Sequence, residues 1–138
     1  MRDKQRFVID TGIFVSAAFW GGLPEKAIEK ATLDGVLIFS ESTSLELISV
    51  FNYEKFDALA SREVRAAFLL KFADVSEMVI VQAPIKECED PNDDKILEAA
   101  FYGKADLVIA SDKKIKKLHP FRQIPVLSPA QFLAWDLP

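Results

Sequence analysis

The sequence predicts an α/β protein of three layers, in which helices cover both faces of a mostly parallel sheet of about five strands. Two observations support this fold class. Short apolar runs alternate along the chain with longer segments of helical periodicity. The runs are apolar at successive positions, as strands are when both faces of the sheet are covered. The 138 residues, of which 50% are hydrophobic, suit one domain over residues 1–138.

Glycine, proline and the spacing of apolar residues mark the elements of the first half. A strand over residues 7–9 ends at Asp10, and Gly21 with Gly22 ends the helix that follows. Next we expect a helix over residues 23–35, a strand over 36–39, a helix over 42–51 and a long helix over 61–75. The side chains expected to face the core from residues 42–51 are Leu45, Ile48 and either Val50 or Phe51.

The second half continues the alternation. Asp90 and Pro91 suit the cap and first position of a helix that Gly103 ends. The remaining expected elements are strands over residues 78–81, 107–110 and 125–127, a short helix over 113–118 and a terminal helix that begins at Ser128.

Charge and cysteine content narrow the classes of function. The formal net charge is −4, so contact with a nucleic acid requires a local basic patch. Cys88 is the only cysteine, which fits a reducing cytosol and excludes an internal disulfide or a four-cysteine zinc site. The charged start does not resemble a signal peptide, and no apolar run is long enough to span a membrane. We therefore expect a cytoplasmic protein with no membrane partner.

Two carboxylates follow predicted strands. Asp10 comes directly after the first strand, and Asp112 follows the strand over residues 107–110. Ligands of parallel sheets bind beyond the carboxyl ends of the strands. Carboxylates there could hold Mg²⁺, which can activate a water for attack on a phosphodiester. Thr11 could hold the Asp10 carboxylate through its hydroxyl. The alternatives are a solvated strand end for Asp10 and a helix cap for Asp112.

Glu46 is a candidate with a strong structural alternative. It lies on the helix predicted over residues 42–51, where Thr43 and Glu46 have the spacing of a capping box. Spacing alone therefore leaves its role open.

The segment after Cys88 contains three more aspartates. Asp90 and Asp93 suit capping and compensation of the helix dipole. Asp94 is not needed for capping, and it lies four residues before Glu98, which makes an unfavourable like-charge pair unless something offsets it. This reasoning favours Asp94 as the metal ligand.

Four segments in this order resemble the PIN domain, the nuclease domain of VapC-type toxins. They are residues 7–17, 44–56, 90–100 and 105–112, which together cover nearly the whole chain. The resemblance implies a Mg²⁺-dependent endoribonuclease, with Mn²⁺ as a substitute, that acts as a toxin component. It also implies an RNA substrate, a cognate antitoxin protein and a homodimer.

The same resemblance assigns catalysis and metal binding to particular residues. It carries both roles to Asp10, Glu46, Asp94 and Asp112, and it is the main argument for Glu46. Ser111, next to Asp112, is expected with Thr11 to support the ligands.

Three positions depart from the family pattern. Gly12 stands where Asn is usual, and Ala110 replaces a Thr in the fourth segment. Lys114 or Ile115 occupies the place of a further acid. The alternative to the nuclease is therefore a PIN fold with weakened catalysis that binds RNA or an antitoxin.

A basic patch follows Asp112. Lys113, Lys116 and Lys117 fall on one face of the short predicted helix. A solvated helix face is the ordinary explanation, but beside an acidic site these side chains could hold RNA phosphates.

Two other families share part of the first motif. Asp10, Thr11 and Gly12 match the Asp-Thr-Gly of aspartic proteases, but the helical periodicity argues against their all-β fold. Phosphatases of the haloacid dehalogenase type would need a second aspartate where Gly12 stands.

Overall fold

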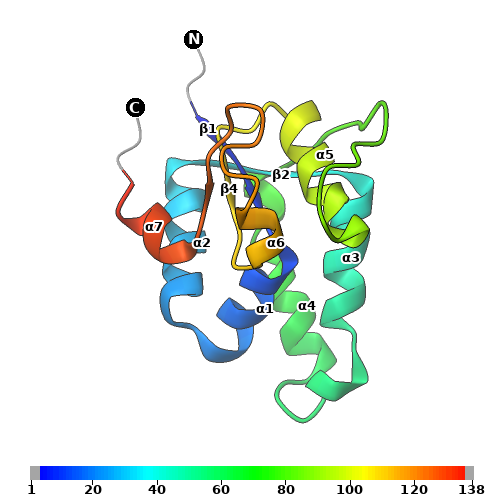
Figure 1. The fold of residues 1–138 in the computed structure, drawn as a ribbon. Helices are drawn as coiled ribbons and strands as arrows, with labels where there is room; N and C mark the ends of the chain where they lie inside the picture. Colours follow the sequence, from blue (N-terminus) through cyan, green and yellow to red (C-terminus); the bar gives the residue numbers. More distant parts are fainter. Residues whose placement is uncertain (1–3, 136–138) are drawn as a thin grey trace.

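The computed structural model describes residues 4–135 and is built round a five-stranded sheet (Figure 1). The strand order is β3-β2-β1-β4-β5, and every pairing is parallel. The strands are β1 (Gln5–Ile9), β2 (Gly35–Phe39), β3 (Ser76–Met78), β4 (Leu107–Ile109) and β5 (Val126–Leu127). The chain first builds the sheet outward on one side of β1 and then on the other. The order therefore reverses between β1 and β4, which is where ligands bind in open α/β sheets.

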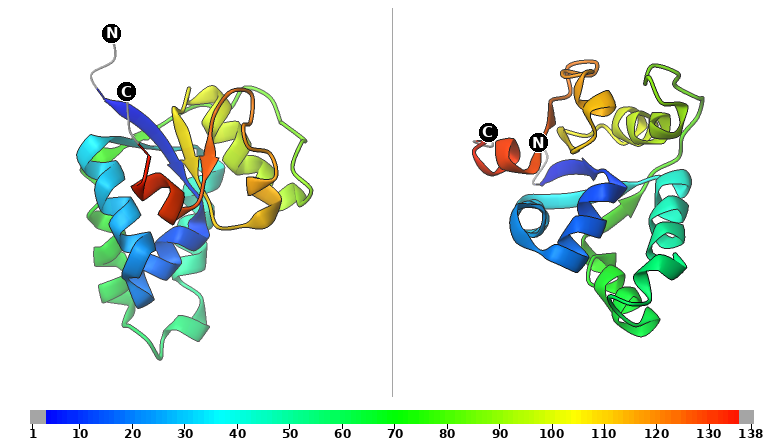
Figure 2. Two further views of the ribbon diagram at one scale, coloured as in Figure 1. Left: turned by 60° about the vertical axis from the view of Figure 1, so that its left-hand side comes forward. Right: turned by 60° about the horizontal axis from the view of Figure 1, so that its bottom comes forward.

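Helices cover both faces of this sheet, which confirms the predicted three-layer α/β class. The α-helices are α1 (Thr11–Trp20), α2 (Gly22–Asp34), α3 (Glu41–Phe51), α4 (Arg62–Leu70), α5 (Asp94–Tyr102), α6 (Lys113–Lys116) and α7 (Pro129–Leu133). The 3₁₀ turns are η1 (Glu54–Phe56), η2 (Ala73–Val75) and η3 (Pro91–Asp93). The second panel of Figure 2 shows the sheet between α5 and α6 on one side and α1 to α4 on the other.

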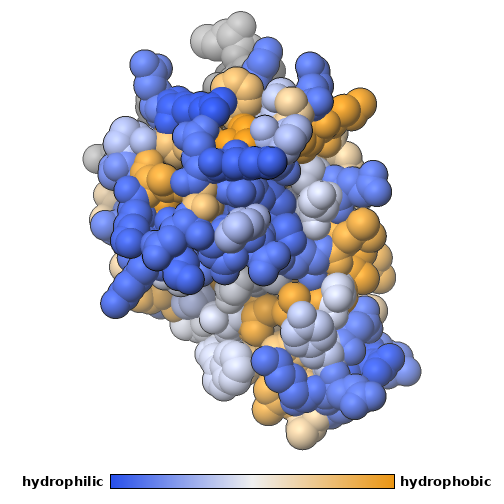
Figure 3. Space-filling view, turned by 45° about the vertical axis from the view of Figure 1, so that its right-hand side comes forward, coloured by the Kyte–Doolittle hydropathy of each residue, from blue (hydrophilic) through white to orange (hydrophobic). Residues whose placement is uncertain are grey.

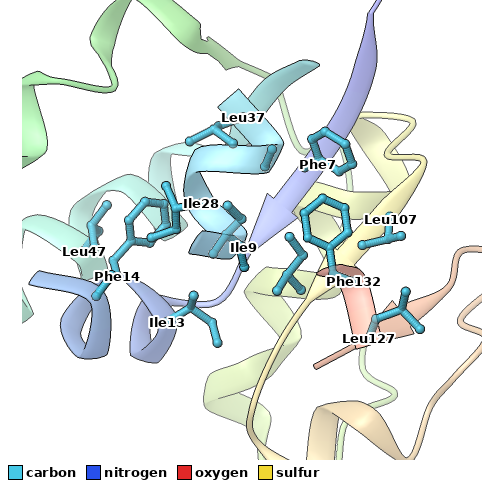
Figure 4. Close-up of a cluster of buried hydrophobic side chains, with 14 of the residues drawn as sticks. Phe7, Ile9, Ile13, Phe14, Ile28, Leu37, Leu47, Leu107, Leu127 and Phe132 are labelled. Carbon is cyan, nitrogen blue, oxygen red and sulfur yellow. The ribbon is translucent and has the colours of Figure 1, made fainter. Parts of the chain in front are cut away.

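Alternation along the strands divides the core into two clusters. Phe7 and Ile9 belong to the cluster under α1, α2 and α7, whereas Val8 between them belongs to the cluster under α5 and α6. Phe132 of α7 packs edge-on against Phe7, with ring centroids 5.3 Å apart (Figure 4). Burying each such side chain contributes about 1.5–3 kcal/mol. Because both faces of β1 are buried, packing on both sides positions Asp10 at the end of the strand.

The third strand and the long fourth helix differ from their predicted bounds. We expected the strand over residues 78–81, but β3 ends at Met78, opposite the last residue of β2, Phe39. The N–H of Val79 still donates to the Phe39 carbonyl oxygen at 2.8 Å, and beyond it no partner strand continues. Ile80 is consequently 82% exposed. The helix expected over residues 61–75 ends at Leu70 and gives way to the η2 turn.

The buried face of α3 matches the prediction at Phe51 but differs at Leu45 and Ile48. Leu45 and Ile48 are 58% and 49% exposed, whereas Thr43, Leu47 and Phe51 are buried. Successive members of this set lie four residues apart, so the buried face of the helix is rotated relative to the expected one.

Figure 3 shows separate hydrophobic patches among hydrophilic side chains on one face of the molecule. Within residues 4–135, no helix is long and apolar enough to cross a membrane.

Candidate active site

Asp10 stands at the carboxyl end of the central strand, at the point where the strand order reverses. Its backbone N–H donates to the carbonyl oxygen of Ile109 at 2.9 Å, which fixes the end of β1 to the end of β4. Asp112 follows β4 by three residues. The parallel sheet thus brings to one edge the two acids that the sequence placed at strand ends.

Glu46 reaches this edge from α3. The capping box of α3 is formed by Ser40 and Thr43, whose backbone N–H groups and side chains bond each other. The sequence alternative, a box between Thr43 and Glu46, is therefore wrong, and the Glu46 carboxylate is not used for capping.

Two side chains hold the Glu46 carboxylate. The hydroxyl of buried Thr11 donates to Oε1 of Glu46 at 2.7 Å. The ammonium of Lys95 on α5 donates to Oε2 at 2.9 Å. Thr11 therefore supports Glu46 through its hydroxyl, whereas we had expected that hydroxyl to hold Asp10. Lys95 was not among the residues predicted from the sequence.

Asp93, and not Asp94, faces the acidic edge. Asp93, Glu46 and Asp112 are the carboxylates whose charges raise the pKa of Asp10. Asp94 points elsewhere: its Oδ1 accepts hydrogen bonds from the backbone N–H groups of Cys88 at 2.8 Å and of Glu87 at 3.2 Å.

Hydrogen bonds from backbone amides offset the repulsion between Asp94 and Glu98, which had favoured Asp94 as a metal ligand. Glu98, on the same face of α5, accepts a hydrogen bond from the backbone N–H of Ile85 at 3.1 Å. Asp94 and Glu98 thus anchor the segment over residues 85–88, and its amides offset the like charges.

A 3₁₀ turn explains why Asp93, rather than Asp94, lies near Asp10. The prediction assumed α-helical geometry from Pro91 onward, but residues Pro91–Asp93 form η3 and α5 begins at Asp94. Each residue of a 3₁₀ turn advances by about 120°, against about 100° in an α-helix. Asp90 caps the turn as predicted, because its side chain accepts from the N–H of Asn92.

Burial and mutual repulsion raise the pKa values of two central carboxyls. Loss of hydration, followed by the charges of Asp93, Glu46 and Asp112, raises the pKa of Asp10 to about 7. The same two causes, with burial first and Asp112 and Asp90 as the leading charges, raise the pKa of Asp93 to about 6. Oδ2 of Asp93 is buried and has no hydrogen-bond partner among the described residues.

This donor set fits a divalent cation. Hard cations bind carboxylate oxygens, and a positive ion would relieve both the repulsion and the unpartnered Asp93 oxygen. The side chains are not yet gathered for ligation, however. Within residues 4–135, no three His, Cys, Asp or Glu side chains form a ready-made metal site. Glu46 in particular is bound on both oxygens by Thr11 and Lys95.

Asp112 has two roles in the structure. Its Oδ1 accepts from the N–H of Lys114 at 2.7 Å and caps α6, which confirms the structural alternative. Its charge also contributes to the raised pKa values of Asp10 and Asp93. Ser111 is exposed, and within the described part of the chain its side chain bonds none of these carboxylates.

The structure shows what surrounds the three positions that depart from the PIN pattern. A Cβ at Gly12 would meet only Oδ2 of Asp10, at 3.9 Å, so the missing side chain leaves room beside that carboxylate. Ala110 and Ile115 are fully buried in the core under α5 and α6. Lys114 stands close enough to Asp93 to oppose the rise of its pKa.

The lysines of α6 are not equivalent. Lys117 forms an ion pair with Glu89 at 2.9 Å. Lys113 and Lys116 have no ion pair among the residues that the structure describes, and Lys113 is exposed. Of the three lysines in the predicted patch, Lys113 and Lys116 are therefore available to bind another molecule.

Comparison with known proteins assigns the family. The model of the PIN domain family matches residues 6–114, so the chain belongs to that family. Among solved structures, the chain is similar to one chain of VapBC2 from Rickettsia felis, in the crystal structure of that complex bound to a DNA fragment from its promoter. The two share 15% sequence identity with a TM-score of 0.62, and the match covers 90% of this chain and 98% of the other. The fold is thus shared with that chain. No curated protein sequence matches.

Proposed function

We propose that this chain is a metal-dependent endoribonuclease and the toxin component of a toxin–antitoxin system, acting in the cytoplasm. The observation that carries the proposal is the group of mutually repelling carboxylates where the strand order reverses. Asp10 and Asp93 have raised pKa values there, and they belong to a chain of the PIN family. Carboxyls with strongly raised pKa values cluster at functional sites.

The metal ligands in this proposal are Asp10, Glu46, Asp93 and Asp112. Asp93 takes the place that the PIN resemblance assigned to Asp94, because Asp94 is bonded to backbone amides. Mg²⁺, or Mn²⁺ in its place, would supply activation of a water and stabilisation of the leaving oxygen. Thr11 orients Glu46 for this task.

RNA and protein partners complete the proposal. Lys113 and Lys116 lie on α6, which Asp112 caps, and could bind the phosphates that flank the cleaved bond. The likeness to a chain of VapBC2, a complex bound to promoter DNA, supports a cognate antitoxin as partner. We further propose that the chain forms a homodimer, as the PIN resemblance implies.

The second candidate is a PIN-fold module that binds RNA or an antitoxin with little or no catalysis. The absent side chain at Gly12 and the positive charge of Lys114 near Asp93 favour it. Both features reduce the support or the negative charge available to a cation.

One cleavage experiment separates the two functions. Purified protein and an Asp10→Asn variant are each incubated with a mixed RNA pool and with Mg²⁺ or Mn²⁺. The nuclease proposal expects cleavage that depends on the metal and that the variant lacks. Equal residual cleavage by both proteins, or none by either, would support the binding module instead.

A further inference from the structure

Lys95 occupies a cation position within the acidic group. Its ammonium lies 2.9 Å from Oε2 of Glu46, and the two side chains are only 25% and 28% exposed. Thr11 holds the other oxygen of the same carboxylate. Glu46 is therefore fully bonded while the nearby Asp93 keeps an unpartnered buried oxygen.

The ion pair with Glu46 depends on where Lys95 lies in α5. Lys95 lies in the first turn of α5, between Asp94, which anchors residues 87–88, and the core residue Ile96. Its side chain lines a cavity of about 570 Å³. Lys86 lines the same cavity from the opposite segment but is exposed and makes no ion pair among the described residues. Of these two lysines, only Lys95 bonds a carboxylate of the site.

We propose that Lys95 is a built-in competitor of the metal: it neutralises Glu46 in the metal-free protein and must release Oε2 before Glu46 can join a bound cation. The inference rests on the proposed metal-dependent function. Thr11 keeps its hold on Oε1 during the exchange, so Glu46 has only one bond to give up. The lysine thereby stabilises the empty site and weakens its affinity for metal.

The expected effects have opposite signs, which distinguishes competition from a purely structural role. Removing the ammonium leaves Glu46 unpaired, so the metal-free protein becomes less stable. It also adds one net negative charge to the site, so Mn²⁺ binds about fivefold or more tightly, as one unit charge acts over several ångströms at protein-surface dielectric. A lysine that only braced the fold would give the loss of stability without the gain of affinity.

The test uses full-length Lys95→Met, Lys95→Arg and the control Lys86→Met. Mn²⁺ dissociation constants are measured by isothermal titration calorimetry, and melting temperatures are measured in chelator and in Mn²⁺. We expect Lys95→Met to melt lower than wild type in chelator and to bind Mn²⁺ about fivefold or more tightly. Lys95→Arg, which keeps the charge, and Lys86→Met should bind Mn²⁺ as wild type does.

The possible negative results distinguish failure of the competition proposal from failure of the metal-dependent function. Mn²⁺ binding that Lys95→Met leaves unchanged or weakens overturns the competition while the metal-dependent function stands. An equal gain of affinity in Lys86→Met also overturns it, because the effect would then be general charge removal. Absence of Mn²⁺ binding by both wild type and Lys95→Met overturns the metal-dependent function together with the inference.

Discussion

The hydroxyl of Thr11 lies 2.7 Å from Oε1 of Glu46, and this one hydrogen bond joins two segments that are 35 residues apart in the sequence. Thr11 directly follows Asp10, so the bond also brings Glu46 beside the end of the central strand. Motif residues from the first and second PIN segments are thereby fixed to each other.

Replacing Thr11 with Val should damage both stability and metal binding. The change keeps the shape of the buried side chain but leaves Oε1 of Glu46 without its donor, which costs about 1–2 kcal/mol. Urea unfolding and Mn²⁺ calorimetry measure the two effects. Thr32→Val is the control, because the hydroxyl of Thr32 is exposed and bonds only its own helix, at Glu29. A Thr11→Val protein that matches this control would refute the supporting role.

Asp93→Ala and Asp94→Ala should have opposite effects on stability and on metal affinity. Asp94→Ala removes two hydrogen bonds to backbone amides and should destabilise the protein by about 1–2 kcal/mol while metal binding survives. Asp93→Ala removes a carboxylate with an unpartnered oxygen, so stability should hold or rise. Its Mn²⁺ affinity should fall at least tenfold, since even outer-shell partners are worth about that much. The reverse pattern in calorimetry and melting would restore Asp94 as the ligand.

The metal-free protein should lose stability as the pH rises from about 4 to 7. The pKa of Asp10 is raised from 3.8 to about 7, so in this range the folded state holds a proton that the unfolded state has released. The free energy of unfolding therefore falls with rising pH, by on the order of 2–4 kcal/mol from this group.

Denaturant titrations in chelator across this range test the pH effect. The Asp10→Asn variant should show a smaller decline than wild type, and Mn²⁺ should reduce the decline in wild type. Identical pH profiles for wild type and variant would show that Asp10 does not carry the effect.

Gly12→Asn should strengthen the site. A Cβ there meets only Oδ2 of Asp10, at 3.9 Å, so the amide fits beside that carboxylate and can donate to it. The added bond should lower the pKa of Asp10 and raise the rate of RNA cleavage. Gly12→Ala is the control, because it supplies the Cβ and the helix propensity without the amide. If the two variants cleave RNA at the same rate, an amide at position 12 does not assist cleavage.

The Lys113→Ala, Lys116→Ala double variant should bind RNA less tightly and with a weaker dependence on salt. Each lost phosphate contact lowers the slope of log affinity against log salt by about 0.7 for a single strand. Lys117→Ala should have less effect because Lys117 is paired with Glu89. Fluorescence anisotropy at several salt concentrations measures the slope. The control is a double alanine variant of Lys26 on α2 and Lys55 on η1, which are both exposed. An unchanged slope would argue against phosphate contact by α6.

The sequence alone determined the layers and much of the acidic edge. Continuous apolar runs require a sheet covered on both faces, and parallel strands place their carboxyl ends together, so Asp10 and Asp112 could be expected to meet. Glu46 could be named only through the PIN resemblance, because its spacing from Thr43 allowed a cap instead. The α3 prediction erred by a rotation of the helix face, which placed Leu45 and Ile48 in the core.

Only the tertiary structure shows which acidic neighbour lies near Asp10 and which cation pairs with Glu46. A single 3₁₀ turn after Pro91 rotates Asp93 toward Asp10 and leaves Asp94 to the backbone of Glu87 and Cys88. The ion pair between Lys95 and Glu46 joins residues 49 apart, and no local pattern announces it. Periodicity reports the average geometry of an element, whereas the direction of one side chain at a helix start depends on local hydrogen bonds and on what packs opposite it.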